Sequence, residues 1–261
     1  DMPVLFIHRT LPDAEIYFVS NQHNEKVIFN GEFRVSQDFS PEHWNPVTGE
    51  IRYLPDFKSK EGYTSLPIEL EGNESAFIVF RKNNKVTRKK DNFPQKTTVY
   101  KIDTPWKITF EAGKRGPEAA VIWSHLKDWT NVNDNKIKYF SGKAVYETEF
   151  VLKELPQKNL YLELGSVMVM AKVTLNGHYV GGAWTYPYSL NVTDFLKEGE
   201  NKLEITVVNN WQNRLIGDQS LLEDQRPTWT TINSWKANSP LQSSGLLGPV
   251  EIQVVDYELV N

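Results

Sequence analysis

Three carboxylates and three tryptophans occur close together in one polar stretch of this sequence. They are Asp218, Glu223 and Asp224, and Trp211, Trp229 and Trp235. Hydrolysis of a glycosidic bond uses two carboxyl groups roughly 5–10 Å apart around a sugar, and these three are the best candidates because they lie close to the tryptophans. Acidic residues in a polar loop are, however, usually solvated or cap a turn, and closeness in sequence does not establish a catalytic geometry. We therefore assign no catalytic residue in this chain.

Sugar binding is the chemistry that these residue types favour more strongly. The apolar C–H face of a pyranose stacks on aromatic rings, and its hydroxyls bind charged and amide groups. The candidate carbohydrate-binding residues are Trp184, Tyr186, Trp211, Arg214, Asp218, Trp229 and Trp235.

Each of these residues also has a structural interpretation. Trp184 and Trp211 adjoin predicted strand ends, where aromatic rings commonly pack a core. Trp229 and Trp235 lie in a strand-poor stretch and could contact either a glycan or another domain. Arg214 and Asp218 are four residues apart and could simply pair with each other.

No cofactor is expected. Asp128 and the Asn/Asp-rich residues 130–135 offer oxygen ligands of the kind that Ca²⁺ prefers, but they lack the spacing and terminal glutamate of an EF-hand loop. A structural Ca²⁺ is conceivable there, and an ordinary turn is favoured. The five histidines show no ligand spacing and there is no cysteine, so a zinc site is not expected.

Composition limits the class of protein. The 261 residues suffice for one large or two ordinary domains. A net charge of −4 argues against nucleic acid as a partner, and no stretch approaches the about 18 apolar residues that span a bilayer. Without cysteine the redox compartment cannot be inferred.

Strand-like runs separated by turn residues predict an all-β protein of two domains. Residues 1–82 are expected to form a small antiparallel β-sandwich. The segment 83–96 belongs to a strongly basic run that interrupts the strand pattern, which is typical of a solvated linker. The second domain is then expected to span 97–261.

Clean alternation in the second domain predicts a jelly-roll β-sandwich. Ala144, Tyr146, Thr148, Phe150 and Leu152 share one strand face. The Asn-Gly pair at 176–177 predicts a two-residue hairpin turn, and 193–198 a one-turn helix. The apolar phase shifts after residue 254, which favours a β-bulge.

Several stretches carry a resemblance to a known family. Residues 144–218 resemble the sugar-binding, galactose-binding-like jelly roll of family 2 glycoside hydrolases. The sequences NRLIGD at 213–218 and SGLLGPV at 244–250 resemble the C-terminal part of family 106 glycoside hydrolases, which are α-L-rhamnosidases. FIHR at 6–9 and AEIYFVSN at 14–21 look like the segment that leaves the catalytic (β/α)₈ barrel in that family.

This resemblance implies a non-catalytic accessory region. The catalytic carboxylates of the family lie on the barrel, which precedes the segment matched here. The implied partners are carbohydrate and that upstream barrel, and the implied location is periplasmic or at the cell surface. Two alternatives remain open: a free-standing carbohydrate-binding module, and a small glycoside hydrolase with its own site. An uncovered apolar surface on the first domain would favour the accessory role.

Overall fold

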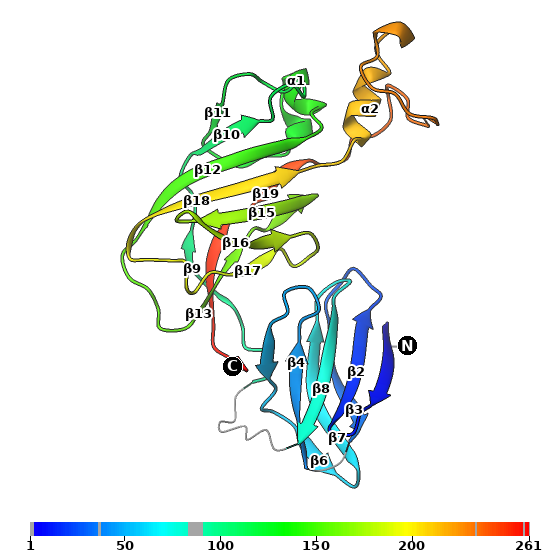
Figure 1. Ribbon diagram of the computed structural model, residues 1–261, viewed down its shortest axis with the longest axis vertical. Helices are drawn as coiled ribbons and strands as arrows, with labels where there is room; N and C mark the ends of the chain where they lie inside the picture. Colours follow the sequence, from blue (N-terminus) through cyan, green and yellow to red (C-terminus); the bar gives the residue numbers. More distant parts are fainter. Residues whose placement is uncertain (1–2, 36–37, 83–90, 233, 258, 261) are drawn as a thin grey trace. The chain divides into compact units, whose positions relative to one another are not determined.

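Two β-sandwich units make up the part of the chain that the computed structural model describes, residues 3–35, 38–82, 91–232, 234–257 and 259–260. The first unit contains Asp1–Thr97 and Val255–Asn261, and the second contains Thr98–Val254 (Figure 1). The predicted all-β fold class is confirmed. No helix in the described part of the chain has the length and apolar character needed to cross a membrane.

Two antiparallel sheets form the first unit. In spatial order the five-stranded sheet contains β1 (Val4–Thr10), β2 (Ala14–Asn21), β8 (Ser75–Lys82), β4 (Phe39–Trp44) and β5 (Ile51–Tyr53). The three-stranded sheet contains β3 (Val27–Arg34), β7 (Tyr63–Leu70) and β6 (Lys58–Lys60). The inward residues of both sheets share one core, in which Ile78 and Phe80 meet Leu66 and Ile68.

A six-stranded and a four-stranded sheet enclose the core of the second unit. The larger sheet contains, in order, β11 (Val121–Trp123), β10 (Trp106–Phe110), β12 (Lys143–Leu152), β18 (Gly199–Val208), β15 (Met170–Leu175) and β16 (His178–Ala183). The smaller contains β17 (Ser189–Asn191), β13 (Asn159–Glu163), β20 (Glu251–Val255) and β9 (Thr97–Lys101). A short pair, β14 (Ser166–Met168) and β19 (Gly245–Gly248), lies beside them.

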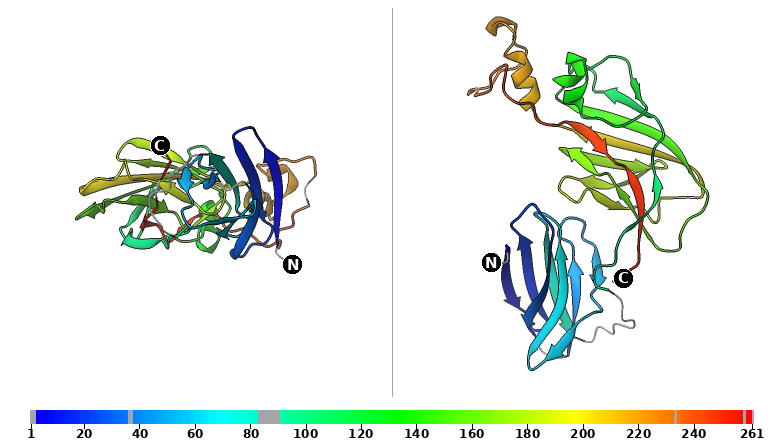
Figure 2. Two further views of the ribbon diagram at one scale, coloured as in Figure 1. Left: turned by 90° about the horizontal axis from the view of Figure 1, so that it is seen from below. Right: turned by 180° about the vertical axis from the view of Figure 1, so that it is seen from behind.

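Short helices complete the second unit. They are η1 (Trp129–Asn131), α1 (Asn135–Lys138), α2 (Gln212–Asp218) and η2 (Glu223–Gln225). In Figure 1 and in the opposite view of Figure 2, α2 and the segment after it project from one end of the second unit. The α2 helix replaces the polar loop that the sequence predicted after Trp211.

The alternation predicted for β12 is confirmed. Its five inward side chains, from Ala144 to Leu152, are all at most 5% exposed. The turn at 193–198 is a single hydrogen-bonded turn rather than a helix, because the Asn201 side chain binds Lys197 N and Lys197 O. Those contacts take up backbone groups that a further helical turn would need.

The C-terminal segment differs from the prediction of one domain over 97–261. It leaves the second unit after Val254 and joins the first, where Val260 N donates to Ile51 O (2.9 Å) and Tyr257 Oη donates to Glu50 (2.6 Å). The shift in apolar phase marks this passage between units, and not a bulge.

The described part of the predicted linker 83–96 also differs from the expectation, because Asn92 and Phe93 pack into the first unit. Asn92 is 2% exposed and exchanges two hydrogen bonds with the backbone of Asp56, both 2.8 Å. Phe93 packs against the first core. Residues 83–90 lie outside the described residues.

The arginine Arg52 on β5 connects both of these segments to the first unit. Its guanidinium donates to Asn92 O and lies 4.7 Å from the ring centre of Phe93 and 5.0 Å from that of Tyr257. An arginine flanked by two aromatic faces gains attraction from both ring quadrupoles. The segment that leads out of the first unit and the segment that returns to it therefore both contact Arg52.

The Asn176–Gly177 turn provides a test of the second fold. Both residues have positive φ, 53° and 81°, and Leu175 pairs with His178 across the turn. Gly177→Val should destabilise the protein by about 1 kcal/mol or more, because a β-branched residue resists positive φ. A Cβ at this position meets no atom within 4 Å, so the cost is a backbone cost.

Denaturant unfolding of Gly177→Val, with Gly177→Asn measured beside it, gives this loss of stability. Asn tolerates positive φ, so this control should lose much less stability. Equal losses in the two variants would contradict the turn assignment.

Candidate carbohydrate-binding site

Strand register brings the two aromatic segments of the second unit to the same end of its larger sheet. Ala183 at the end of β16 pairs with Ala171, which pairs with Val207 near the end of β18. Neighbouring strands are about 4.8 Å apart, so the exits from β16 and β18 lie about 10 Å apart. Residues 184–188 and 209–244 therefore start from one edge of the unit.

The buried hydroxyl of Tyr146 links the elements that lie under this edge. The Tyr146 hydroxyl accepts a hydrogen bond from Trp129 Nε1 (2.6 Å) and another from Leu246 N (3.2 Å). Tyr146 and Trp129 are fully buried. Burial raises the pKa of Tyr146 far above its ordinary value, so the hydroxyl keeps its proton. Strand β12, helix η1 and strand β19 are thereby held together.

Asn213 attaches α2 to this support. Its amide nitrogen donates to Gln242 O (2.5 Å) and to the Ser244 hydroxyl (3.1 Å), and its carbonyl accepts from Gln242 N (2.8 Å). Asn213 is 1% exposed. A seven-residue helix is marginal by itself, so these bonds to a distant segment are what stabilise it.

Asp128 continues the same network. Its Oδ1 caps η1 by accepting from Thr130 N (2.9 Å) and also accepts from Ser244 N (3.1 Å). Burial raises the pKa of Asp128, but hydrogen bonds from Thr130 and from the Ser243 and Ser244 region outweigh burial and leave the pKa below its usual value. The carboxylate is a structural anion at neutral pH.

The residues weighed as calcium ligands are thus used as helix caps. Asp128 caps η1, and Asp134 caps α1 by accepting from Lys136 N (2.8 Å). Within the described ranges, no group of three or more His, Cys, Asp or Glu side chains is placed to hold a metal ion.

Arg214 and Asp218 bind each other. Arg214 Nη2 lies 2.7 Å from Asp218 Oδ1 across one turn of α2, and the Thr228 hydroxyl donates to Asp218 Oδ2 (2.6 Å). Asp218 is 1% exposed. Its carboxylate closes the segment after α2 onto the helix, which leaves it poorly placed to receive a sugar hydroxyl.

The aromatic candidates, in contrast, are exposed. The exposed fractions are 81% for Trp229, 66% for Trp211, 59% for Trp184 and 51% for Tyr186, and Trp235 is partly buried. The interpretation of Trp184 and Trp211 as core residues is therefore wrong. Both adjoin strand ends, but their rings lie outside the core.

The carboxylates near these rings do not form a hydrolytic pair that the geometry supports. Asp218 is buried and bound to Arg214 and Thr228, whereas Glu223 and Asp224 are exposed in the first turn of η2. General acid catalysis by a carboxyl group usually needs a partly desolvated site. The two η2 carboxylates lack that environment.

Sequence reasoning missed the residues that hold the site together. Asn209 accepts from Gly142 N (3.0 Å) and donates to Phe140 O (2.8 Å), and Ser244 and Thr228 act as described above. The available signal was weak: asparagines at the end of a strand often bind backbone groups. Their partners lie far away in sequence and could not be named.

Comparison with known proteins matches the two units differently. Residues 1–59 match the family described as alpha-L-rhamnosidase, and residues 123–237 match the glycosyl hydrolase 2 galactose-binding domain-like family. The resemblance inferred from the sequence is confirmed.

Two relatives extend these matches. The structure of a rhamnosidase from Novosphingobium sp. PP1Y is similar over 96% of this chain, with 36% identity and a TM-score of 0.86. A protein named "Putative beta-glucuronidase" from Formosa agariphila is 45% identical over an alignment of 161 positions that covers 52% of this chain. The chain spans 24% of the rhamnosidase and 14% of the Formosa protein.

The Asp128 network predicts a pH-dependent loss of stability. Asp128→Asn should destabilise the protein by about 1–2 kcal/mol at pH 7, because hydrogen bonds to a charged acceptor are replaced by neutral ones. The folded pKa lies below the unfolded one, so this contribution is complete above about pH 4 and is lost as the pH falls through the folded pKa.

Urea unfolding at pH 7 and at successively lower pH measures the difference from the wild type. Asp134→Asn is the matched control, since Asn caps a helix about as well as Asp. A difference for Asp128→Asn that stays constant below pH 4 would contradict the charged role.

The Arg214–Asp218 pair predicts non-additive stability changes. Asp218→Asn should cost about 2–3 kcal/mol, because it leaves a mostly buried guanidinium without its counter-charge. The double variant Arg214→Met, Asp218→Asn should lose less than the sum of the two single changes. Additive losses in thermal or denaturant unfolding would argue against a coupled pair.

Proposed function

We propose that this chain is the non-catalytic C-terminal accessory region of an exported α-L-rhamnosidase-type glycoside hydrolase. Its role is to brace the catalytic domain of the same polypeptide and to present an aromatic segment to carbohydrate. The observation that carries the proposal is the similarity over 96% of this chain to a part amounting to 24% of a rhamnosidase. Such a match supports a two-unit piece of a larger enzyme.

The site geometry favours support over catalysis. Polar side chains that could do chemistry, Asp128, Asn213 and Asp218, are engaged in anchoring the projecting segment. Large apolar side chains in this segment, among them Trp211, Trp229 and Ile232, face solvent, as do the carboxylates of Glu223 and Asp224. Exposed aromatic rings with few free polar partners suit stacking contacts, either with a sugar face or with a protein surface.

Carbohydrate binding by the isolated chain is the second candidate function, favoured by the exposure of Trp229 and Trp211. With the polar groups of the site mostly engaged, the affinity should be weak. A dissociation constant near millimolar corresponds to about 4 kcal/mol. A free-standing module of this kind would use the same end of the second unit.

We predict that the isolated chain does not hydrolyse aryl α-rhamnosides. The reason is that Asp218 is engaged and Glu223 and Asp224 lie in solvent. The hydrolytic activity is measured as release of the aryl group by the purified protein. Turnover that disappears on changing Asp218, Glu223 or Asp224 to Ala would overturn the non-catalytic assignment and favour a small hydrolase.

Titration with rhamnose and galactose, followed by NMR, tests the contact with sugar. Trp229→Ala and Trp235→Ala should abolish any shifts. Tyr179→Ala is the matched control, because Tyr179 is 61% exposed but lies beside the Asn176–Gly177 turn at the opposite end of the sheet. Binding that survives both tryptophan changes, or that maps to the first unit, would contradict the proposed site. No binding by the wild type would leave the bracing role alone.

A further inference from the structure

One row of side chains on the outer face of the five-stranded sheet is apolar across every strand. Strand register aligns one row of side chains over the sheet: Ile7 beside Phe18, Phe18 beside Phe77, Phe77 beside Trp44, and Trp44 beside Ile51. An antiparallel sheet with one solvated face normally carries polar residues in such a row. This row has none.

The smaller sheet of the first unit does not cover that row. The shared core contains Tyr17, Val19, Ile78 and Phe80, which alternate with the row residues and so point to the other face. On the outer face, Ile7 is 56% exposed and Leu5, two residues earlier, is 65% exposed, while Phe18, Phe77 and Trp44 are partly buried by one another and their neighbours.

The central part of the row is held in place. Trp44 Nε1 donates to Glu42 Oε2 (2.7 Å), and the Arg81 guanidinium lies 5.6 Å from the Trp44 ring centre. The rings of Phe18 and Phe77 are 5.1 Å apart between centroids. Side chains fixed in this way lose little conformational freedom when a partner covers them.

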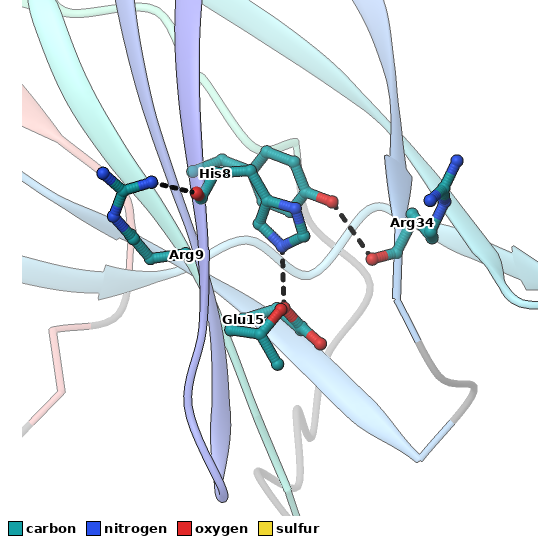
Figure 3. A network of polar contacts seen from close by, with 6 residues as sticks. His8, Arg9, Glu15 and Arg34 are labelled. Atoms are coloured by element: carbon teal, nitrogen blue, oxygen red, sulfur yellow. Dashed lines mark hydrogen bonds and ion pairs between the residues drawn. The ribbon is translucent and has the colours of Figure 1, made fainter.

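Polar contacts on the other side of β1 keep this edge strand in the sheet. Figure 3 shows His8 and Glu15 on one side of β1 and Arg9 on the other. His8 Nε2 bonds to Glu15 Oε2 (2.7 Å), and the His8 ring stacks on Tyr17 with centroids 4.0 Å apart. These contacts hold β1 against β2, so Ile7 stays in the outer row although the apolar side chains of β1 are poorly buried.

We propose that this outer face is the surface on which the catalytic domain of the same polypeptide rests. The inference depends on the proposed function and specifies the contact that the bracing role needs. The alpha-L-rhamnosidase family match at residues 1–59 includes β1, β2, β4 and β5, four of the five strands of this sheet. A sheet that carries an apolar row on its outer face, besides the face that forms the core, is normally enclosed between two layers, the second often helical.

A saccharide suits this face less well than a protein layer does. The charged side chains close to the row are Glu42, which is 1% exposed and bonded to Trp44, and the cations Arg9 and Arg81. Two hydroxyls lie beside it, those of Ser20, which accepts from Gln22, and Ser75. Sugar recognition needs several accessible groups that bind hydroxyls. Two arginines beside an apolar row instead match a partner helix with an apolar stripe and acidic neighbours.

Radical footprinting of aromatic side chains tests the inference on the protein itself. Oxidation of Trp44 and Phe18 is compared between the isolated chain and the intact polypeptide that includes the catalytic domain. We expect about five-fold or greater protection of both in the intact polypeptide, because the centre of such an interface excludes water. Tyr179 in the second unit is the reference and should be oxidised equally in both.

Binding in trans separates failure of this inference from failure of the proposed function. The purified catalytic domain is mixed with the wild-type chain, with Ile7→Glu, and with Tyr179→Glu as the matched control. We expect Ile7→Glu to weaken binding at least about ten-fold, since a charge is desolvated in an apolar contact, and Tyr179→Glu to leave it unchanged.

Binding without protection of Trp44 would overturn the assignment of this face and leave the bracing role standing. No binding in trans and no protection in the intact polypeptide would overturn both. Protection of Trp44 in the isolated chain on raising its concentration, with dimers in sedimentation, would assign the face to a second copy. Protection on adding a rhamnose oligosaccharide would assign it to glycan.

Discussion

The candidate site depends on the two hydrogen bonds that the Tyr146 hydroxyl accepts. Two donors from distant parts of the sequence, Trp129 Nε1 and Leu246 N, donate to one oxygen in a buried core. Leaving either donor unpaired there would cost the full desolvation penalty of a polar group. The geometry of β12, η1 and β19 is therefore closely determined. Asn213 on α2 and Asp128 at the start of η1 both bond to Ser244, so the position of α2 is fixed relative to these elements.

Both units bury some polar side chains and expose some large apolar ones. Asp218, Asn92 and Glu42 are buried and engaged with neighbours, whereas large aromatic and aliphatic side chains such as Trp229 and Phe6 face outward. Monomeric proteins rarely expose apolar groups so freely without a partner. Under the proposed accessory role, these side chains would be covered by the rest of a longer polypeptide.

The sequence predicted those features that neighbouring residues decide among themselves. The period-two pattern of β12 and the positive-φ pair at Asn176 and Gly177 are local, and both were predicted. The ion pair of Arg214 and Asp218 was foreseen because their spacing is local once a helix exists. The helix itself was not foreseen, since its stability comes from Asn213 bonding to residues about thirty positions away. The apolar row over five strands was equally hidden, because it emerges only from the pairing register.

The double attachment at Arg52 has a consequence for how the chain is made. Residues 98–254 are contiguous, so the ribosome delivers the second unit as an uninterrupted stretch that can complete its own core. The first unit receives Tyr257 and Val260 only after that whole stretch has been translated. Until then the Arg52 guanidinium has the Phe93 ring beside it and lacks the Tyr257 ring. Of the two units, the one whose translation begins earlier is thus the one that is completed later.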